Sequence, residues 1–213
     1  MKIHSFVFGY FQENTYILWD ETKECVIIDP GNTNYQEDQI LFNFIEQHQL
    51  KPVRLLLTHG HIDHIAGNDS VFQRYKLLPE VHQEDLFLIQ AHELTAQMYG
   101  IPCTPSPLPK RYIQENEIIR FGNSELLTIH TPGHSPGSIT YYSAKYNFAI
   151  VGDVLFYESI GRTDLPKGDF NTLKNSILKK LYQLPDETII YSGHGNPTKI
   201  GYEKKYNMFV REE

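Results

Sequence analysis

The sequence has few of the features that stabilise extracellular or membrane proteins. Its 213 residues include two cysteines, Cys25 in an apolar run and Cys103 in a proline-rich segment. A disulfide framework is therefore not expected, and a reducing compartment fits best. No stretch approaches the roughly 20 apolar residues of a membrane-spanning helix. The opening MKIHSFVFGYFQENTY lacks the apolar core and cleavage site of a secretory signal. We expect a cytoplasmic protein with no membrane partner.

An excess of positive charge is also missing. The chain has 26 acidic and 19 basic residues, which gives a formal net charge of −7. A surface of this sign repels phosphate backbones and anionic lipid headgroups, which argues against nucleic acid as the main partner. The basic residues near the C-terminus are more typical of a solvated helix face. A small-molecule substrate is the expected partner, and the sequence does not indicate an oligomeric state.

The chain does have enough apolar residues for one sizeable core. Hydrophobic residues make up 40% and charged residues 21% of the sequence, and this length suits one α/β domain over residues 1–213. Period-two and helical patterns alternate along the chain. Strands are predicted at 2–8, 15–19, 26–29, 53–57, 76–81, 117–121, 125–130, 138–143, 147–151 and 188–191. Helices are predicted at 37–49, 64–75, 83–99 and from 169 to about 183. This order predicts a sandwich of two mixed sheets covered by helices on both outer faces.

The segment His59-Gly60-His61-Ile62-Asp63-His64 is the strongest functional signal. Three imidazoles and a carboxylate in six residues are too dense for a core, because each buried polar ring needs a partner. The segment follows a predicted buried strand, so its turn can direct several side chains to one point. Imidazole nitrogen and carboxylate oxygen are ligands of zinc and iron. The hexapeptide therefore indicates a metal site.

Three further ligand candidates occupy the same local context as His59. Each of His134, Asp153 and His194 follows a strand-like run and has a small residue or turn former beside it. Side chains at the same edge of several strands converge in space although they are far apart in sequence. The remaining histidines lack this context, so His4, His48, His92 and His130 are interpreted as surface or structural residues. His82 follows a short strand, and a place near the mouth of a cleft is left open for it.

These motifs resemble those of the metallo-β-lactamase superfamily, whose HxHxDH motif corresponds to His59–His64. More narrowly, the chain is similar to the short, single-domain members of the glyoxalase II branch. The stretches that carry this resemblance are 11–16, 131–138, 161–164, 192–195 and 200–209. The resemblance covers nearly the whole chain and implies the metallo-β-lactamase αββα sandwich, with two mixed sheets flanked by helices.

The resemblance also implies a ligand set and a mechanism. His59, His61 and His134 would hold one metal, Asp63, His64 and His194 would hold a second, and Asp153 would bridge the two. Two divalent ions are implied, with zinc expected and iron or manganese left open. A hydroxide shared by the metals would attack a polarised carbonyl. Asp63 would also be catalytic, because its second oxygen could orient that nucleophile. The substrate-binding residues are not identified.

The leading functional hypothesis is hydrolysis of a thioester, as in hydroxyacylglutathione hydrolases. A persulfide dioxygenase with a single iron is the first alternative, since those proteins share the Gly161–Asp164 type of loop, and a lactonase is another. A β-lactam substrate is not expected, because Asp153 stands where β-lactamases of this fold lack an aspartate. A nuclease and a non-catalytic metal protein fit less well.

Two loops near the predicted site have open roles. Arg162 could meet an anionic substrate, although a buried Arg162–Asp164 ion pair that fixes the loop is the favoured interpretation. The proline-rich loop between Tyr99 and Tyr112 could form a wall of the substrate site or a disordered surface connection.

Overall fold

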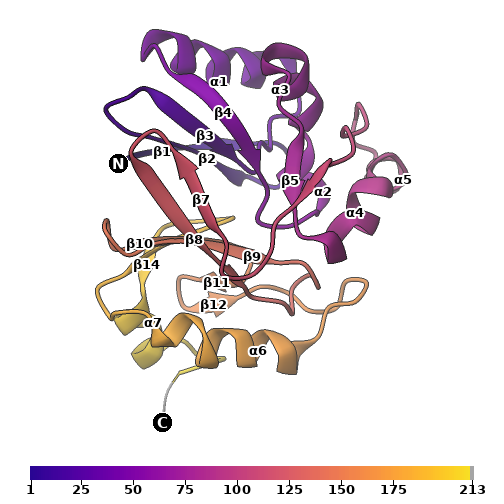
Figure 1. Cartoon of the computed structure of the whole chain (residues 1–213). Helices are drawn as coiled ribbons and strands as arrows, with labels where there is room; N and C mark the ends of the chain where they lie inside the picture. Colours follow the sequence, from indigo (N-terminus) through magenta and orange to yellow (C-terminus); the bar gives the residue numbers. More distant parts are fainter. Residues whose placement is uncertain (212–213) are drawn as a thin grey trace. The chain divides into compact units, whose positions relative to one another are not determined.

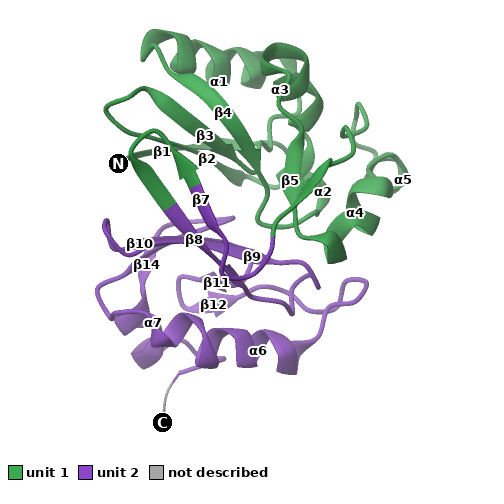
Figure 2. Cartoon of the chain, viewed as in Figure 1, with its two compact units in different colours: residues 1–113, 120–125 green, residues 114–119, 126–213 purple. Residues whose placement is uncertain are grey.

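The computed structural model describes residues 1–211, which form two compact units (Figures 1 and 2). Unit 1 comprises residues 1–113 and 120–125, and unit 2 comprises residues 114–119 and those from 126 onward. Each unit is built on one mixed six-stranded sheet. Two mixed sheets were predicted from the order of the elements, and this prediction is confirmed. The prediction of one domain over the whole chain stays a prediction.

The sheet of unit 1 changes from antiparallel to parallel pairing at its third strand. The strands lie in chain order and are antiparallel from β1 to β3 and parallel from β3 to β6. They are β1 (Lys2–Phe8), β2 (Glu13–Trp19), β3 (Glu24–Ile28), β4 (Lys51–Leu56), β5 (Pro79–Val81) and β6 (Arg111–Tyr112). The first five agree with the predicted strands, while β6 has only two residues and no periodicity to reveal it.

Helices pack over a face and along the β5 side of this sheet (Figure 1). They are α1 (Tyr35–Gln47), α2 (Ile62–Ile65), α3 (Asn68–Tyr75), the 3₁₀ helix η1 (Gln83–Asp85), α4 (Leu86–Gln90) and α5 (His92–Tyr99). Asn34 caps the N-terminus of α1, because its side chain accepts a hydrogen bond from the Glu37 N–H. Its buried Leu41 and Ile45 pack in one cluster with Ile27 of β3. Each such side chain stabilises the fold by roughly 1.5–3 kcal/mol.

Two predicted helices are interrupted. The predicted helix 64–75 is divided between α2 and α3 at Gly67, whose N–H donates to Pro30 O at 2.7 Å. A side chain at Gly67 would start 2.0 Å from Asn32 Oδ1, so the close packing of these segments fixes the break. The predicted helix 83–99 is divided at Ala91, where φ is −87° and ψ is 1°. The second helix therefore changes direction there instead of running straight.

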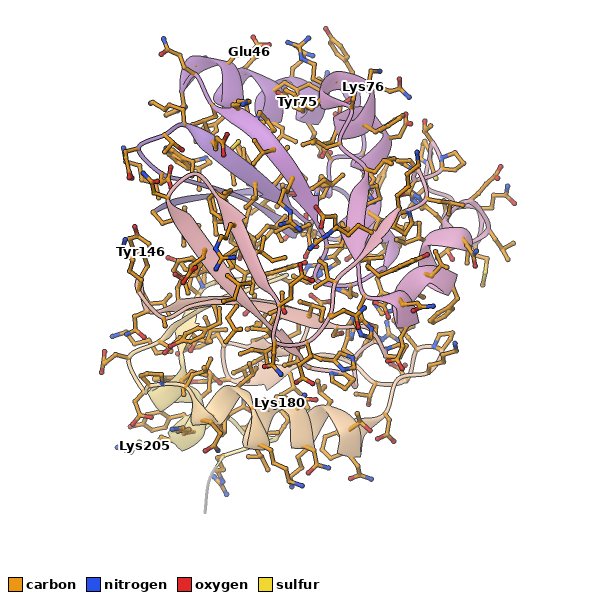
Figure 3. All side chains as sticks on the ribbon, in the orientation of Figure 1. Glu46, Tyr75, Lys76, Tyr146, Lys180 and Lys205 are labelled. Atoms are coloured by element: carbon orange, nitrogen blue, oxygen red, sulfur yellow. The ribbon has the colours of Figure 1, made fainter. Side chains whose placement is uncertain are left out.

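Helices α1 and α3 pack against each other on the outside of unit 1 (Figure 3). Tyr75 of α3 meets Phe42 of α1 edge-on with a ring-centroid separation of 5.6 Å. Arg74 of α3 forms an exposed ion pair with Glu46 of α1. The aromatic contact is the stronger link, because exposed ion pairs contribute little.

The sheet of unit 2 is mostly antiparallel and contains one parallel pair. Strand β10 lies parallel to β13, and the sheet order is β14-β13-β10-β9-β8-β7. The strands are β7 (Ile118–Phe121), β8 (Ser124–His130), β9 (Ile139–Ser143), β10 (Phe148–Gly152), β13 (Ile189–Ser192) and β14 (Thr198–Lys199). A separate small hairpin of β11 (Leu155–Phe156) and β12 (Ser159–Ile160) lies within the segment that was predicted to be a long loop.

Helix α6 (Phe170–Lys179) covers this sheet and is followed by η2 (Leu181–Gln183). Asp169 caps α6 by accepting from the Thr172 N–H, and Leu173 and Ile177 pack in a cluster with Ala149 of β10. Lys180, labelled in Figure 3, donates to His130 O at 2.7 Å and thereby ties the end of α6 to β8. Helix α7 (Ile200–Tyr206) follows β14. No helix in residues 1–211 is long and apolar enough to cross a bilayer.

Candidate metal centre

Unit 1 brings the four ligand candidates of the hexapeptide together. Strand β4 ends at Leu56, and α2 begins at Ile62, so the turn between them carries His59 and His61 while Asp63 and His64 lie on the first turn of α2. The ring centroid of His59 lies 4.7 Å from that of His61 and 4.1 Å from that of His64. His64 Nε2 lies 3.9 Å from Asp63 Oδ2. These nitrogen and oxygen atoms form a compact donor set.

Asp29 orients two of these imidazoles and was not predicted as a site residue. Its Oδ2 accepts from His64 Nδ1 at 2.9 Å and from the Thr58 hydroxyl, and its Oδ1 accepts from the Thr58 N–H at 2.7 Å. Because the Thr58 hydroxyl donates to Asp29, it accepts from His59 Nδ1, which lies 3.1 Å away. Both imidazoles are thus protonated on Nδ1, and each directs its Nε2 lone pair toward a metal.

A second buried carboxylate holds the turn of the hexapeptide. Asp85 is fully buried and accepts from the Gly60 N–H at 2.9 Å. A side chain on Gly60 would start 2.9 Å from Leu88 Cβ, so this position needs glycine for close packing. The turn that separates His59 from His61 is therefore fixed by α4 and by Asp85.

Glu13 lies directly behind the ligands of unit 1. It is fully buried, and its Oε1 is 3.8 Å from His64 Nδ1. Burial raises the pKa of Glu13 well above its usual range, although the nearby His64 opposes that shift. Gly31 allows this approach, because a Cβ there would fall 2.1 Å from Glu13 Oε2 and 2.7 Å from Asp63 O. Glu13 belongs to the stretch 11–16 that carried the resemblance, but no role was predicted for it.

Unit 2 brings the other three ligand candidates together around one oxygen. Strands β10 and β13 pair in parallel with Gly152 opposite Ser192, so Asp153 and His194 leave the same end of the sheet. Asp153 Oδ2 lies 3.6 Å from His134 Nε2 and 3.5 Å from His194 Nε2. Two ligands bonded to one tetrahedral ion at about 2.1 Å stand about 3.4 Å apart. Both separations are too long for good hydrogen bonds and suit metal coordination.

The backbone of the Gly161–Asp164 loop supports these ligands. His134 Nδ1 lies 2.8 Å from Arg162 O, a carbonyl that can only accept, so His134 presents its Nε2 lone pair to Asp153 and a metal. Gly161 permits this contact, because a Cβ there would lie 1.8 Å from Asp153 O and 3.1 Å from His134 Nδ1. The loop therefore acts on the ligands through its backbone.

The Arg162 side chain forms the predicted ion pair, but the pair is exposed instead of buried. Its Nε and terminal nitrogen donate to the two Asp164 oxygens at 2.7 Å each. Exposed fractions of 59% and 68% show that solvent reaches both side chains. The hydrogen bonds from Arg162 lower the pKa of Asp164 to about 2. The expectation of burial was wrong because the loop is fixed by Gly161 and the Arg162 carbonyl and needs no buried charge.

The donor chemistry of each unit fits divalent metal. All seven predicted side chains offer imidazole nitrogen or carboxylate oxygen. Hydrogen-bond acceptors that are not themselves proposed ligands orient the imidazoles of His59, His64 and His134. Metal binding by the seven side chains stays a prediction, and the geometry of each unit supports it separately. The seven are His59, His61, Asp63, His64, His134, Asp153 and His194.

The other histidines have packing or capping roles. His4 stacks on Phe44 at 4.2 Å between ring centroids, His48 contacts the same ring, and His130 lies 2.7 Å from Pro136 O through its Nε2. His82 caps η1 by accepting from the Glu84 N–H. His92 is buried and accepts from the Ser106 N–H at 3.0 Å. The proline-rich loop is therefore anchored at Ser106, which is buried too.

Comparisons with known proteins agree with this chemistry. A sequence model of the metallo-β-lactamase superfamily matches residues 8–194. Hydroxyacylglutathione hydrolase GloC of Haemophilus influenzae is 40% identical over 205 residues, with 95% of each chain covered. The structure of the BLEG-1 B3 metallo-β-lactamase has a TM-score of 0.90 and 36% identity, covering 99% of this chain and 100% of that one. A di-iron-bound form of TTHA1623 has a TM-score of 0.87 and 34% identity, covering 97% and 100%.

The fold and the donor set thus define a metallo-hydrolase. The chain belongs to the metallo-β-lactamase superfamily and has the fold of that family, as the sequence motifs predicted. Proteins of this family bind divalent metal ions, and the clusters of histidine and aspartate in this chain fit such ions.

Proposed function

We propose that this protein is a cytoplasmic thioester hydrolase of the hydroxyacylglutathione hydrolase type. The observation that carries the choice of substrate class is the 40% identity to the Haemophilus influenzae hydroxyacylglutathione hydrolase across 95% of both chains. The partner in this proposal is a small molecule, with no nucleic acid and no membrane. The net charge of −7 supports that part of the proposal.

The proposed ligands follow the family motif. By this motif His59, His61 and His134 would hold one ion, Asp63, His64 and His194 would hold the other, and Asp153 would contact both. Divalent ions supply an acidified water near neutral pH and polarise an ester carbonyl. Zinc is the proposed metal, and iron is the alternative that the similarity to the di-iron form of TTHA1623 favours.

The side chains of this protein supply orientation and proton placement. Asp29 keeps His59 and His64 protonated on Nδ1, directly or through Thr58. The Arg162 carbonyl does the same for His134. Asp63 is the proposed catalytic residue, because a carboxylate oxygen facing the attacking water can accept a hydrogen bond from it and fix its direction.

The test is thiol release from S-lactoylglutathione by protein loaded with zinc or with iron. We expect metal-dependent release that His59→Ala and Asp153→Ala abolish, while His48→Ala, a surface histidine in unit 1, retains full activity. Circular dichroism spectra of all variants should match. Release that survives either ligand substitution would contradict the assigned site, and no release from S-lactoylglutathione or other acyl thioesters would reject the substrate class.

β-Lactam hydrolysis is a second candidate: Asp153 argues against it, but the 36% identity and TM-score of 0.90 to a B3 metallo-β-lactamase favour it. The same protein preparations should therefore be assayed with a chromogenic cephalosporin. Faster turnover of the cephalosporin than of every thioester would replace the first proposal.

Oxygen consumption with a persulfide substrate separates hydrolysis from persulfide oxidation, because hydrolysis consumes no oxygen.

A further inference from the structure

A pair of exposed aromatic side chains joins two distant segments of unit 1. Phe11 lies in the turn between β1 and β2, and Tyr99 is the last residue of α5. Their rings meet edge-on with centroids 5.6 Å apart. Solvent nevertheless reaches 42% of Phe11 and 53% of Tyr99. The pair therefore keeps aromatic surface open to a ligand, and such surface is typical of the walls of small-molecule sites.

Both segments pack on the helix that carries two of the proposed metal ligands. Helix α2, with Asp63 and His64, contacts α5 and also β2, the strand that follows the turn of Phe11. At the start of β2, Glu13 Oε1 lies 3.8 Å from His64 Nδ1. The aromatic pair thus lies beside the ligands of unit 1 and not on a remote surface of that unit.

The backbone holds each ring at a defined place. In the turn, the Gln12 N–H donates to Gly9 O at 3.3 Å, and the Gly9 N–H donates to Glu37 Oε1 of α1 at 3.1 Å. On the other side, α5 is anchored by its buried His92 and Ala96. Because little freedom is left to lose, a ligand that packs on these rings pays a small entropic cost.

The surroundings of the pair suit an apolar group and not an anion. Segments 7–12 and 92–100 contain no lysine or arginine, and Glu93 is their one acidic residue. Tyr10, Leu94 and Met98 in the same segments are exposed as well. The carboxylates of a carrier such as glutathione would find no cationic partner among these residues. The acyl side chain is the part of a thioester that matches this surface.

We propose that Phe11 and Tyr99 form an apolar wall for the acyl side chain and make the protein selective for thioesters with an aromatic or bulky apolar acyl group. This inference rests on the proposed thioester hydrolysis and names the substrate class within it. It gives Tyr99, where the proline-rich loop begins, the role of a substrate wall. Both residues determine specificity, and neither takes part in breaking the bond.

The test compares S-mandeloylglutathione with S-lactoylglutathione on the zinc-loaded protein. The two thioesters share the thiol and the α-hydroxyl group and differ only in a phenyl against a methyl group. We expect kcat/KM to be about tenfold higher for the mandeloyl thioester, which is the low end of the discrimination that an apolar site achieves.

Substitutions assign this preference to the two rings. Phe11→Ala and Tyr99→Ala should each raise KM for the mandeloyl thioester several-fold and leave its kcat and both constants for the lactoyl thioester unchanged, because the wall binds the ground state and the transition state equally. Tyr99→Phe keeps the ring and should retain the wild-type preference. A merely structural role would instead lower kcat for both thioesters by the same factor, and that result would overturn the proposal.

The matched control is Tyr206→Ala in α7 of unit 2. Tyr206 is 50% exposed, and its ring centroid lies 4.8 Å from that of Tyr202. This variant should keep the preference, and an equal change in Tyr206→Ala and Tyr99→Ala would overturn the proposal. Turnover of the lactoyl thioester without any preference for the mandeloyl thioester would overturn this inference alone. No release from either would reject thioester hydrolysis and the inference with it. Thermal melts establish that each variant is folded.

Discussion

Asp29 connects backbone geometry to ligand geometry at a single residue. Its φ of +49° lies in the left-handed region, which Asp tolerates better than most residues. This conformation follows β3 and leads into Pro30-Gly31, while the carboxylate accepts hydrogen bonds from Thr58 and His64. The residue therefore sets the direction of two proposed ligands without being one itself.

Asp29→Asn tests this role. Asparagine keeps the size of the side chain but loses the second acceptor oxygen, so His64 or Thr58 must give up a hydrogen bond. We expect metal affinity to fall 10- to 100-fold, as is typical when an outer-sphere partner is removed. Competition with a chromophoric chelator measures the affinity.

Asp20→Asn is the matched control for Asp29→Asn. Asp20 is also buried at the end of a strand, and it accepts from Ser124 Oγ at 2.8 Å, far from any proposed ligand in sequence. Its substitution should lower stability and leave metal affinity unchanged. An unchanged metal affinity in Asp29→Asn would mean that Asp29 serves stability alone.

Gly161→Ala tests the loop beside the other ligands. The added Cβ would lie 1.8 Å from Asp153 O, so the Asp153 backbone or the loop must shift. Since misplacement of a catalytic group by about 1 Å can cost 100-fold in rate, we expect at least that loss in thiol release. Gly100→Ala is the control, because Gly100 has no atom within 4 Å of the new Cβ and only its left-handed φ of +66° opposes the substitution. It should cost about 1 kcal/mol in stability and leave activity intact.

The seven ligand candidates, which stay a prediction, were found from the sequence because the hexapeptide is a local motif and His134, Asp153 and His194 follow strand-like runs. Asp29 and Asp85 could not be found in this way, because their contacts join residues 35 and 25 positions apart in the sequence. The available local signal was an aspartate between a buried strand and Pro30-Gly31. Such a signal indicates a turn as readily as a site.

At the scale of elements, tertiary contacts overrode helical periodicity. The pattern over 64–75 is helical, yet the chain breaks at Gly67 because Pro30 O and the Asn32 side chain occupy the space beside it. The strands were predicted more accurately, since their buried runs are bounded by turn residues such as Pro30-Gly31 and Gly122-Asn123. The two-residue strands β6, β11 and β12 have too few residues to show a pattern.

His92 accepts a hydrogen bond from the Ser106 N–H of the proline-rich segment 100–109, and its burial makes the stability of the protein dependent on pH. Burial lowers the pKa of His92 to about 4, below the usual 6.5. The unfolded chain therefore takes up a proton as the pH falls through 6.5, while the folded protein does not until about pH 4. The contribution of His92 is fully present above pH 6.5 and is lost between pH 6.5 and about 4.

Urea unfolding at pH 7 and pH 5 measures this loss. At up to about 1.4 kcal/mol per pH unit, the wild type should lose about 2 kcal/mol more than His92→Asn over this interval. All other titrating groups are common to both proteins, so the difference isolates His92. Equal losses in the two proteins would show that His92 has the same pKa in the folded and unfolded states.

At the scale of the whole molecule, the order of elements predicted both mixed sheets and the family resemblance predicted the fold that the comparisons confirm. The proposed metal ions then contribute to stability by linkage, because the unfolded chain does not preserve the ligand geometry. At a free metal concentration about 1,000 times the dissociation constant, binding stabilises the native state by about 4 kcal/mol. For a chain of this length, that corresponds to a rise in melting temperature of roughly 8–16 °C.

Scanning calorimetry before and after chelation tests this linkage. Removal of metal should lower the melting temperature by that amount and abolish thiol release, and added zinc or iron should restore both. His59→Ala and Asp153→Ala should melt near the temperature of the metal-free wild type and respond little to chelation. His48→Ala should respond as the wild type does.

A melting temperature that is the same with and without metal would refute tight binding by these ligands. Loss of stability with retained thiol release would separate a structural metal from the catalytic role that the donor set of His59, Asp153 and their neighbours predicts.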